Sequence, residues 1–379
     1  MAAPDYIPAL TGFRGFAAMI VLLNHAGIFS GQADFPPVRH AYFGVHCFFC
    51  LSGALFALLY FEKADVRPAF LGRFYLARFI RIFPVYWLVL AIYALSVSPV
   101  EWAALGWHAV MGHGFFHEYR DAINVPMWTL PVECGFYLLV PWVFVAMRAL
   151  RHRFVSPIAA ARSWHWTHAV SLLLITIVLW GIGAALHTLA PGDPDWWKGT
   201  IFGRFSQFGL GVATGLLLAD VQSGAIRLPR AAGNWITVVA FGLLVAQVAA
   251  LELIDQQTAP GSLRWLYFGA KLSLALTACL LIVAAFCGSV WQRFLASRPL
   301  VYLGVISYTL YLLQSASAGP VRDLSETTAR LFRGHGVGSW PTVALTMMVC
   351  LGVAVVVHHL FDSPVHRWLR RRLLRRPAS

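Results

Sequence analysis

Residues 232–251 read AGNWITVVAFGLLVAQVAAL, a run of 20 residues that contains no charged side chain. A helix of this length, at about 1.5 Å per residue, crosses the roughly 30 Å hydrocarbon core of a lipid bilayer. Nine other predominantly apolar segments have about this length. The sequence therefore predicts an all-α integral membrane protein with about ten transmembrane helices in one bundle. The predicted spans are residues 9–30, 41–61, 79–98, 127–147, 168–190, 199–219, 232–251, 265–287, 300–318 and 340–361.

Two further segments fall outside these spans. The apolar run at 102–116 is too short to cross a bilayer, so we interpret it as an interfacial or re-entrant segment. Residues 1–366 then form one transmembrane domain, and residues 367–379 form a basic cytoplasmic tail. The first apolar run continues too far for a cleavable signal peptide, and it already contains Arg14.

The overall composition excludes an ordinary soluble protein. Hydrophobic residues make up 59% of the chain and charged residues 12%, whereas about 25% of residues are charged in a typical soluble domain. So much apolar surface cannot be buried in water, and lipid must cover part of it. The formal net charge of +13 could suggest nucleic-acid binding, but the cations gather in the short connections between apolar runs. We therefore expect no nucleic-acid partner.

The same cations predict the orientation of the chain. With the N-terminus placed in the cytoplasm, 19 of the 29 Lys and Arg residues fall in cytoplasmic connections and in the C-terminal tail. Ten of the 16 acidic residues fall on the other side. A missed or invented span would disturb this alternation, so the pattern favours an even number of spans with both termini in the cytoplasm.

Cysteine and histidine spacing does not indicate a metal or redox site. Cys47 and Cys50 form a C-x-x-C pair inside a predicted span, but no second pair accompanies them. His108, His113 and His117 are spaced irregularly for metal ligands. We expect buried free thiols, no disulfide framework and no metal.

Ionisable residues inside the spans are the strongest functional signal, because each is costly in lipid. Arg14 and His25 are eleven residues apart in the first span. That spacing is close to three helical turns, so both lie on one helix face, about 16 Å apart along the axis. Separately, Arg14 could reach the lipid phosphates and His25 could be a buried structural residue. Together on one face, they favour a functional site.

Glu133 lies in the fourth predicted span, which runs in the direction opposite to the first. It comes early in its span and His25 comes late, so the topology places the two at a similar depth. A carboxylate that orients a histidine is the usual support for a general base. A purely structural pair between two helices is the alternative.

Arginines gather at the predicted cytoplasmic end. Arg78 and Arg81 share a helix face, and Arg14 belongs at the same end. Their forked donors suit phosphate oxygens, although Arg73 is interpreted as an ordinary topological anchor. The bundle is thus expected to bind phosphate at its inner mouth and to carry acid–base groups in its outer half.

These residues occur in segments that resemble, in order along the chain, those of the bacterial membrane acyltransferase 3 family. The first is Arg14 with His25, an Arg-x10-His pair. The other matching segments are residues 43–53, 78–84, 128–138, 303–312 and 362–364. No single segment is specific, but their shared order supports the resemblance.

The resemblance implies transfer of an acyl group, usually acetyl, from cytoplasmic acyl-CoA to a hydroxyl of a carbohydrate, glycolipid or glycosylated small molecule. It implies a multi-pass protein of the bacterial plasma (inner) membrane, in contact with lipid, with acyl-CoA as a substrate and no resident cofactor. By the same analogy His25 is the general base, and Glu133 is its partner or a cavity-lining acid. Arg14, Arg78 and Arg81 then face the CoA phosphates.

Several other polar residues are expected to line the cavity or bind the acceptor. Tyr308, Tyr311 and Gln314 make the ninth span unusually polar, although they could equally form interhelical hydrogen bonds. Three positions depart from the family pattern. His46 stands in place of the usual Asp, Gln314 in place of a frequent His, and Cys134 where a second acid or Gln often follows the glutamate. The complete expected set is His46, Ser52, Trp128, Tyr308, Tyr311 and Gln314.

Two other functions are alternatives to the acyltransferase. A proton-coupled or anion transporter, or a flippase, could pass its substrate along Arg14, Glu133 and His25. Such proteins often show inverted repeats, and the sequence has none that we detect. A structural subunit of a polysaccharide export complex would not need buried charges. The acyltransferase remains the favoured hypothesis.

Overall fold

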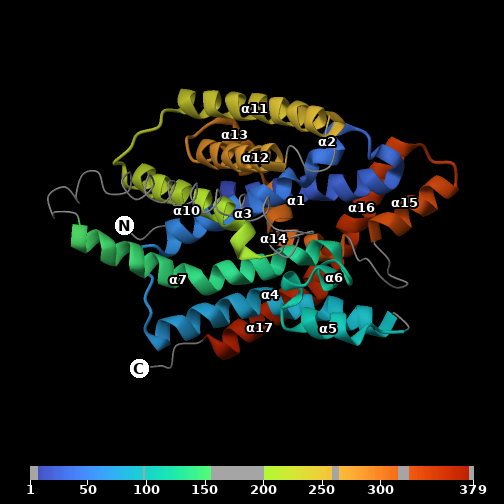
Figure 1. Ribbon diagram of the computed structural model, residues 1–379, viewed down its shortest axis with the longest axis horizontal. Coiled ribbons are helices and arrows are strands. Elements are labelled where there is room, and N and C mark those ends of the chain that lie inside the picture. Colours follow the sequence, from blue (N-terminus) through green and yellow to red (C-terminus); the bar gives the residue numbers. More distant parts are fainter. Residues whose placement is uncertain (1–6, 97–98, 155–199, 258–263, 315–323, 375–379) are drawn as a thin grey trace.

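The computed structural model describes residues 7–96, 99–154, 200–257, 264–314 and 324–374, and every regular element in these ranges is a helix (Figure 1). The predicted span at 168–190 lies outside the described residues. The long helices are α1 (Pro8–Gly27), α3 (Phe43–Tyr60), α4 (Pro68–Ser96), α7 (Thr129–Phe154), α10 (Ile201–Ser223), α11 (Arg230–Gln257), α12 (Arg264–Ala284), α14 (Arg298–Leu313) and α16 (Ser339–Val357).

In the described part of the chain, seven segments are long and apolar enough to cross a membrane. They cover residues 8–32, 36–60, 68–95, 125–149, 201–223, 230–254 and 339–373. Two further helices are apolar over shorter lengths, Gly269–Ala284 and Arg298–Leu313. A multi-pass helical bundle is therefore confirmed, while the count of ten spans and the cytoplasmic position of the termini remain predictions.

The segment at 102–116 is too short to cross the membrane, as expected. It forms α5 (Trp102–Ala109) and a single 3-10 turn at His113–Phe115. The remaining short helices are α2 (Pro36–Arg39), α6 (His117–Arg120), α13 (Val290–Leu295) and α15 (Leu324–Gly334).

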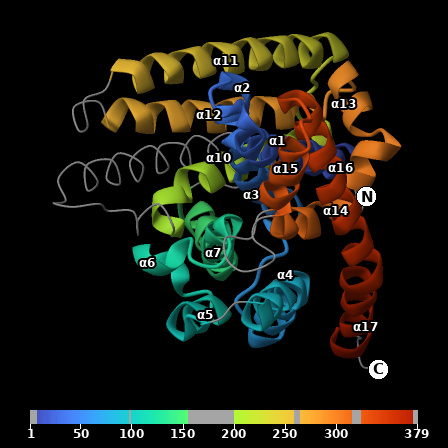
Figure 2. The ribbon, with the colours of Figure 1, turned by 90° about the vertical axis from the view of Figure 1, so that its right-hand side faces the viewer.

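The helices are arranged in layers. In both views α11 and α12 lie along one edge of the bundle, and α4 and α5 lie along the opposite edge (Figures 1 and 2). Between them α3 packs along α10, and α1 packs along α14. The start of α4 and the end of α7 lie toward the left of Figure 1, whereas α5 and α6 lie toward the right. We call these the basic end and the opposite end of the bundle.

Glycine allows the central helices to touch backbone to backbone. A Cβ added at Gly53 of α3 would collide with the Phe208 carbonyl oxygen of α10, and one added at Gly211 would collide with the Cys50 carbonyl oxygen. Small residues let helices approach closely in membranes, where packing drives association. This contact fixes the position of α3, which forms one wall of the cavities described below.

The C-terminal basic segment is part of the bundle. After α16, a π-helical turn at His358–Asp362 leads into α17 (Ser363–Leu373), which packs against α4. Buried Asp362 fixes this turn, because its Oδ2 accepts hydrogen bonds from Thr309 Oγ1 and His358 Nδ1, both at 2.9 Å. The expected boundary between residues 366 and 367 therefore falls inside a helix.

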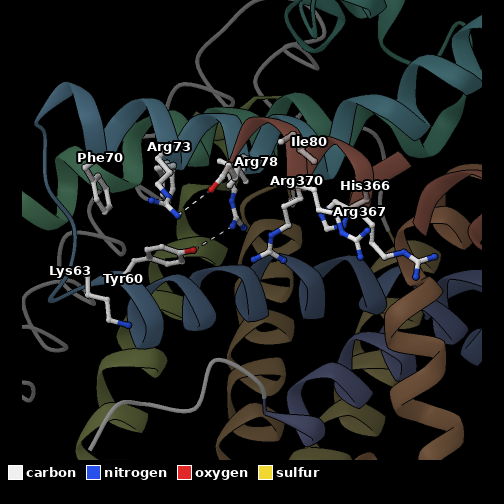
Figure 3. Close-up of a pocket in the computed structure, with 13 residues that line it drawn as sticks. Tyr60, Lys63, Phe70, Arg73, Arg78, Ile80, His366, Arg367 and Arg370 are labelled. Atoms are coloured by element: carbon white, nitrogen blue, oxygen red, sulfur yellow. Dashed lines mark hydrogen bonds between the residues drawn. The ribbon is translucent and has the colours of Figure 1, made fainter. Parts of the chain in front are cut away.

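Helix α4 begins eleven residues before the span expected at 79–98. The sequence interpretation excluded the preceding residues because Arg73 and Arg78 are charged. In the structure these two side chains face a cavity beside α17 (Figure 3).

Candidate active site

Two adjoining cavities open in the bundle. The inner cavity, of about 520 Å³, is lined by α1, α3, α4, α7, α14 and α17. The second cavity, of about 880 Å³, lies between α4, α17 and the end of α3 (Figure 3). We call it the vestibule. The residues that line both cavities are Tyr60, Arg78, His366 and Arg370.

The inner cavity brings together most of the residues singled out in the sequence. Arg14 comes from α1, Glu133 from α7, and Arg78 and Arg81 from α4. The other expected residues that line it are Ser52, Tyr308 and Tyr311. With Arg370 of α17, segments far apart in sequence thus supply four arginines and one carboxylate to a single cavity.

Glu133 belongs to the arginine cluster. The Tyr137 hydroxyl, one turn further along α7, donates a hydrogen bond to Glu133 Oε1, and Arg14 interacts electrostatically with Glu133, Arg81 and Arg78. Among the described residues, no hydrogen bond joins Glu133 to His25. The structure thus supports the cavity-lining alternative for Glu133.

The expected equal depth of Glu133 and His25 fails because α7 begins deep inside the bundle. Asn124, just before α7, is fully buried and donates from Nδ2 to the Leu312 carbonyl at 2.8 Å. Thr129, the first residue of α7, lies 3.1 Å from the Tyr311 hydroxyl. Four more residues carry Glu133 about 6 Å further toward the basic end.

Aromatic rings hold the arginines without neutralising them. The Arg81 guanidinium lies 5.5 Å from the ring centroid of Tyr308, and Arg78 donates to the Tyr60 hydroxyl at 3.4 Å. Such cation–π contacts orient a guanidinium and leave its charge available to an anion. The rings around Arg78 are Phe56 at 5.3 Å, Phe74 at 5.8 Å, and Tyr60 and Tyr137 at 5.9 Å.

His25 lies beyond the far end of the inner cavity and is not among its lining residues. Helix α1 is unbroken from Pro8 to Gly27, so the spacing of about 16 Å between Arg14 and His25 holds. Leu22 packs in the same cluster as Leu310 of α14, and His25 follows Leu22 by three residues, so His25 lies beyond the level of Leu310 and Tyr311. Its buried Nδ1 has no hydrogen-bond partner among the described residues.

The other expected residues lie outside the cavity lining. His46 is buried, and the Gln207 amide is 3.1 Å from its Nδ1. Trp128 lies under the guanidinium of Arg204, 4.8 Å from the ring centroid. Gln314 is buried at the end of α14.

Sequence reasoning missed the contribution of α17. His366, Arg367, Arg370 and Arg371 line the vestibule, but their charges were attributed to topology. Their spacing places them on one face of a helix, and Pro364 at its second position is a typical helix start. Those two signals together could have identified the helix.

Comparison with known proteins fits this geometry. The model of the family described as "Acyltransferase domain" matches residues 7–359. The chain belongs to the acyltransferase 3 family.

Three relatives show how far this likeness extends. The chain is 27% identical to YrhL of Bacillus subtilis, by its name a candidate peptidoglycan O-acetyltransferase, over 95% of this chain and 55% of YrhL. It is 23% identical to the O-acetyltransferase OatA of Staphylococcus aureus, over 82% and 50% of the two chains. It is 26% identical to the acyltransferase MdmB of Streptomyces mycarofaciens, over 97% and 93%. The chain spans about half the length of YrhL and OatA. No solved structure matches it.

Proposed function

We propose that the chain is an O-acyltransferase of the bacterial plasma membrane. It moves an acyl group, acetyl in the simplest case, from cytoplasmic acyl-CoA to a hydroxyl of a carbohydrate or glycoconjugate. The observation that carries this proposal is the convergence of Arg14, Arg78 and Arg81 on one cavity beside Glu133. Guanidinium groups bind phosphate through paired donors, and acyl-CoA is an acyl donor rich in phosphate.

His25 is the general base in this proposal. Its ring accepts the proton of the acceptor hydroxyl while the oxygen attacks the thioester carbonyl carbon. The tetrahedral intermediate then collapses, the carbon–sulfur bond breaks, and the proton passes to the departing CoA thiolate. The products are the acylated acceptor and free CoA. Polar groups at the outer end of the inner cavity, such as the Thr129 and Tyr311 hydroxyls, are placed to stabilise the oxyanion.

The layout of the cavities supports this division of labour. The arginines lie toward the basic end and His25 lies about 16 Å away along α1. The inner cavity reaches from the arginines to Thr129 and Tyr311, short of His25. A donor whose phosphates meet the arginines can therefore extend its thiol-bearing arm toward His25. The carbohydrate acceptor is supported by the name of YrhL, which specifies peptidoglycan.

The test is turnover of acetyl-CoA by the purified protein, followed as release of free CoA with and without carbohydrate acceptors. We compare wild type with His25→Ala and, as a matched control, His335→Ala, because His335 is exposed. Loss of a general base is expected to lower turnover by roughly 10²- to 10⁴-fold, with CoA binding retained and the control unaffected. A wild-type protein that neither binds nor cleaves acyl-CoA would overturn the enzyme proposal and favour transport.

A further inference from the structure

The vestibule is lined by six cationic side chains and, among the described residues, by no acidic one. The cations are Lys63, Arg73, Arg78, Arg367, Arg370 and Arg371. None of the six forms an ion pair with a carboxylate in the described part of the chain. Like charges around one cavity repel one another, and an anion with several charges relieves that repulsion.

Helix α17 presents these charges on one face. Arg367, Arg370 and Arg371 line the vestibule, whereas Trp368 and Leu373 are 55% and 51% exposed. Arg372 also points away from the cavity, with its guanidinium 5.6 Å from the Trp368 ring centroid. The helix thus has a cavity face and an outward face, and both carry arginine.

The cavity face is held in place by contacts that leave the charges available. Arg73 of α4 donates to the carbonyl of Leu374, just after α17, at 3.5 Å, and Arg367 donates to the Ser363 carbonyl at 3.2 Å. Buried Asp362 anchors the start of the helix. Figure 3 shows Arg370 of α17 and Arg78 of α4 pointing into the same space.

The two cavities meet at Arg78 and Arg370, so an anion in the vestibule can extend a chain into the inner cavity. In CoA the diphosphate joins the pantetheine arm to the ribose, and the 3′-phosphate lies on the far side of the ribose. Residues shared by both cavities then meet the diphosphate. Residues that line the vestibule alone, including Arg367 and Arg371, meet the 3′-phosphate.

We propose that the vestibule is a subsite for the nucleotide end of the donor, in which Arg367 and Arg371 of α17 recognise the 3′-phosphate. This inference rests on the proposed function and narrows it to donors that carry a 3′-phosphate. An anionic lipid headgroup offers similar chemistry, so the experiment separates the two sources.

The experiment measures binding of CoA and 3′-dephospho-CoA to the full-length protein in nanodiscs of neutral phosphatidylcholine. Wild type is expected to bind CoA about ten- to hundredfold more tightly than 3′-dephospho-CoA, because the arginines donate hydrogen bonds to the charged 3′-phosphate. The double variant Arg367→Ala/Arg371→Ala is expected to lose that preference and to bind 3′-dephospho-CoA as wild type does. Arg372→Ala, on the outward face of the same helix, is the matched control and keeps the preference.

Equal binding of CoA and 3′-dephospho-CoA by wild type would overturn the subsite and leave the proposed function standing. Failure to bind either compound would instead remove the proposed function. If the double variant does not fold, competition of adenosine 3′,5′-bisphosphate with CoA on wild type decides the question, and absence of competition overturns the subsite.

A second set of nanodiscs contains phosphatidylglycerol. Loss of CoA binding there, restored by the double variant, would assign the arginines to lipid.

Discussion

At the scale of single residues, the inner cavity shows how aromatic rings orient arginines inside a helical bundle. Arg78 sits among four aromatic rings and Arg81 lies over Tyr308. Glu133 is the acidic residue of the lining, so the described lining keeps a net positive charge. Such an environment retains affinity for phosphate, which full pairing with carboxylates would remove.

Arg78→Lys is expected to weaken donor binding. Lysine keeps the charge but loses the planar fork and the stacking that fit both phosphate and the aromatic cage. We expect KM for acetyl-CoA to rise about tenfold and kcat to change less, measured by steady-state CoA release. Arg227→Lys at an exposed site is the control. An unchanged KM in Arg78→Lys would contradict a phosphate role for this residue.

Glu133→Gln tests the separation of Glu133 from His25. Removing the carboxylate makes the arginine cluster more positive, so we expect CoA to bind several-fold more tightly, as measured by equilibrium titration. Because His25 lies beyond the far end of the cavity, away from Glu133, the acid limb of the pH–rate profile is expected not to move. Glu118→Gln, at an exposed position, is the control. A shifted acid limb would show that Glu133 orients His25 after all.

At the scale of helices, sequence periodicity and length located most elements, since apolar runs of about 20 residues need not compete with any soluble alternative. Periodicity and length could not show which charged residues belong to a helix. The start of α4 and the whole of α17 were assigned to connections and tail because arginine is costly in lipid. In both helices these arginines line a cavity, and hydropathy does not detect a cavity.

Gly211→Ala tests the close contact between α3 and α10. The new methyl group would meet the Cys50 carbonyl oxygen, so we expect a loss of stability of about 1–3 kcal/mol from overpacking. Gly242→Ala in α11 is the matched control, because a Cβ there meets nothing within 4 Å. Alanine is a better helix former by about 1 kcal/mol, so the control is expected to be neutral or slightly stabilised. Thermal unfolding in detergent compares the two, and equal melting temperatures would contradict the packing argument.

At the scale of the whole molecule, the arginines and the buried His25 lie at different levels along the bundle. The vestibule and the arginine cluster lie toward the basic end, and His25 lies further along α1. The sequence predicted this order through the Arg14–His25 spacing, which one unbroken helix guarantees. It misplaced Glu133 because the depth of α7 depends on a contact between Asn124 and Leu312 of α14. Such long-range contacts set relative helix depth and leave no local signal in the sequence.

The connection between α4 and α7 contains a buried histidine pair that links whole-molecule stability to pH. The rings of His108 and His113 stack with centroids 3.7 Å apart, and both side chains are fully buried. Burial lowers the pKa of His113 to about 4. Burial, together with the neighbouring His113, lowers the pKa of His108 to about 3. In the unfolded chain both titrate near about 6.5.

Above pH 6.5 both rings are neutral in either state, so they contribute no pH dependence. As the pH falls below that value, the unfolded chain binds protons that the folded protein cannot, so stability falls until the pH reaches the folded pKa values. At pH 5 each histidine is expected to lower the free energy of unfolding by about 2 kcal/mol.

His113→Phe removes one titrating group and the hydrogen bond to the Met127 carbonyl. It should therefore be less stable at pH 7 yet lose less than wild type between pH 7 and pH 5. Thermal melts at both pH values measure this difference, with His335→Phe as the exposed control, and identical pH dependence in wild type and His113→Phe would contradict the assignment.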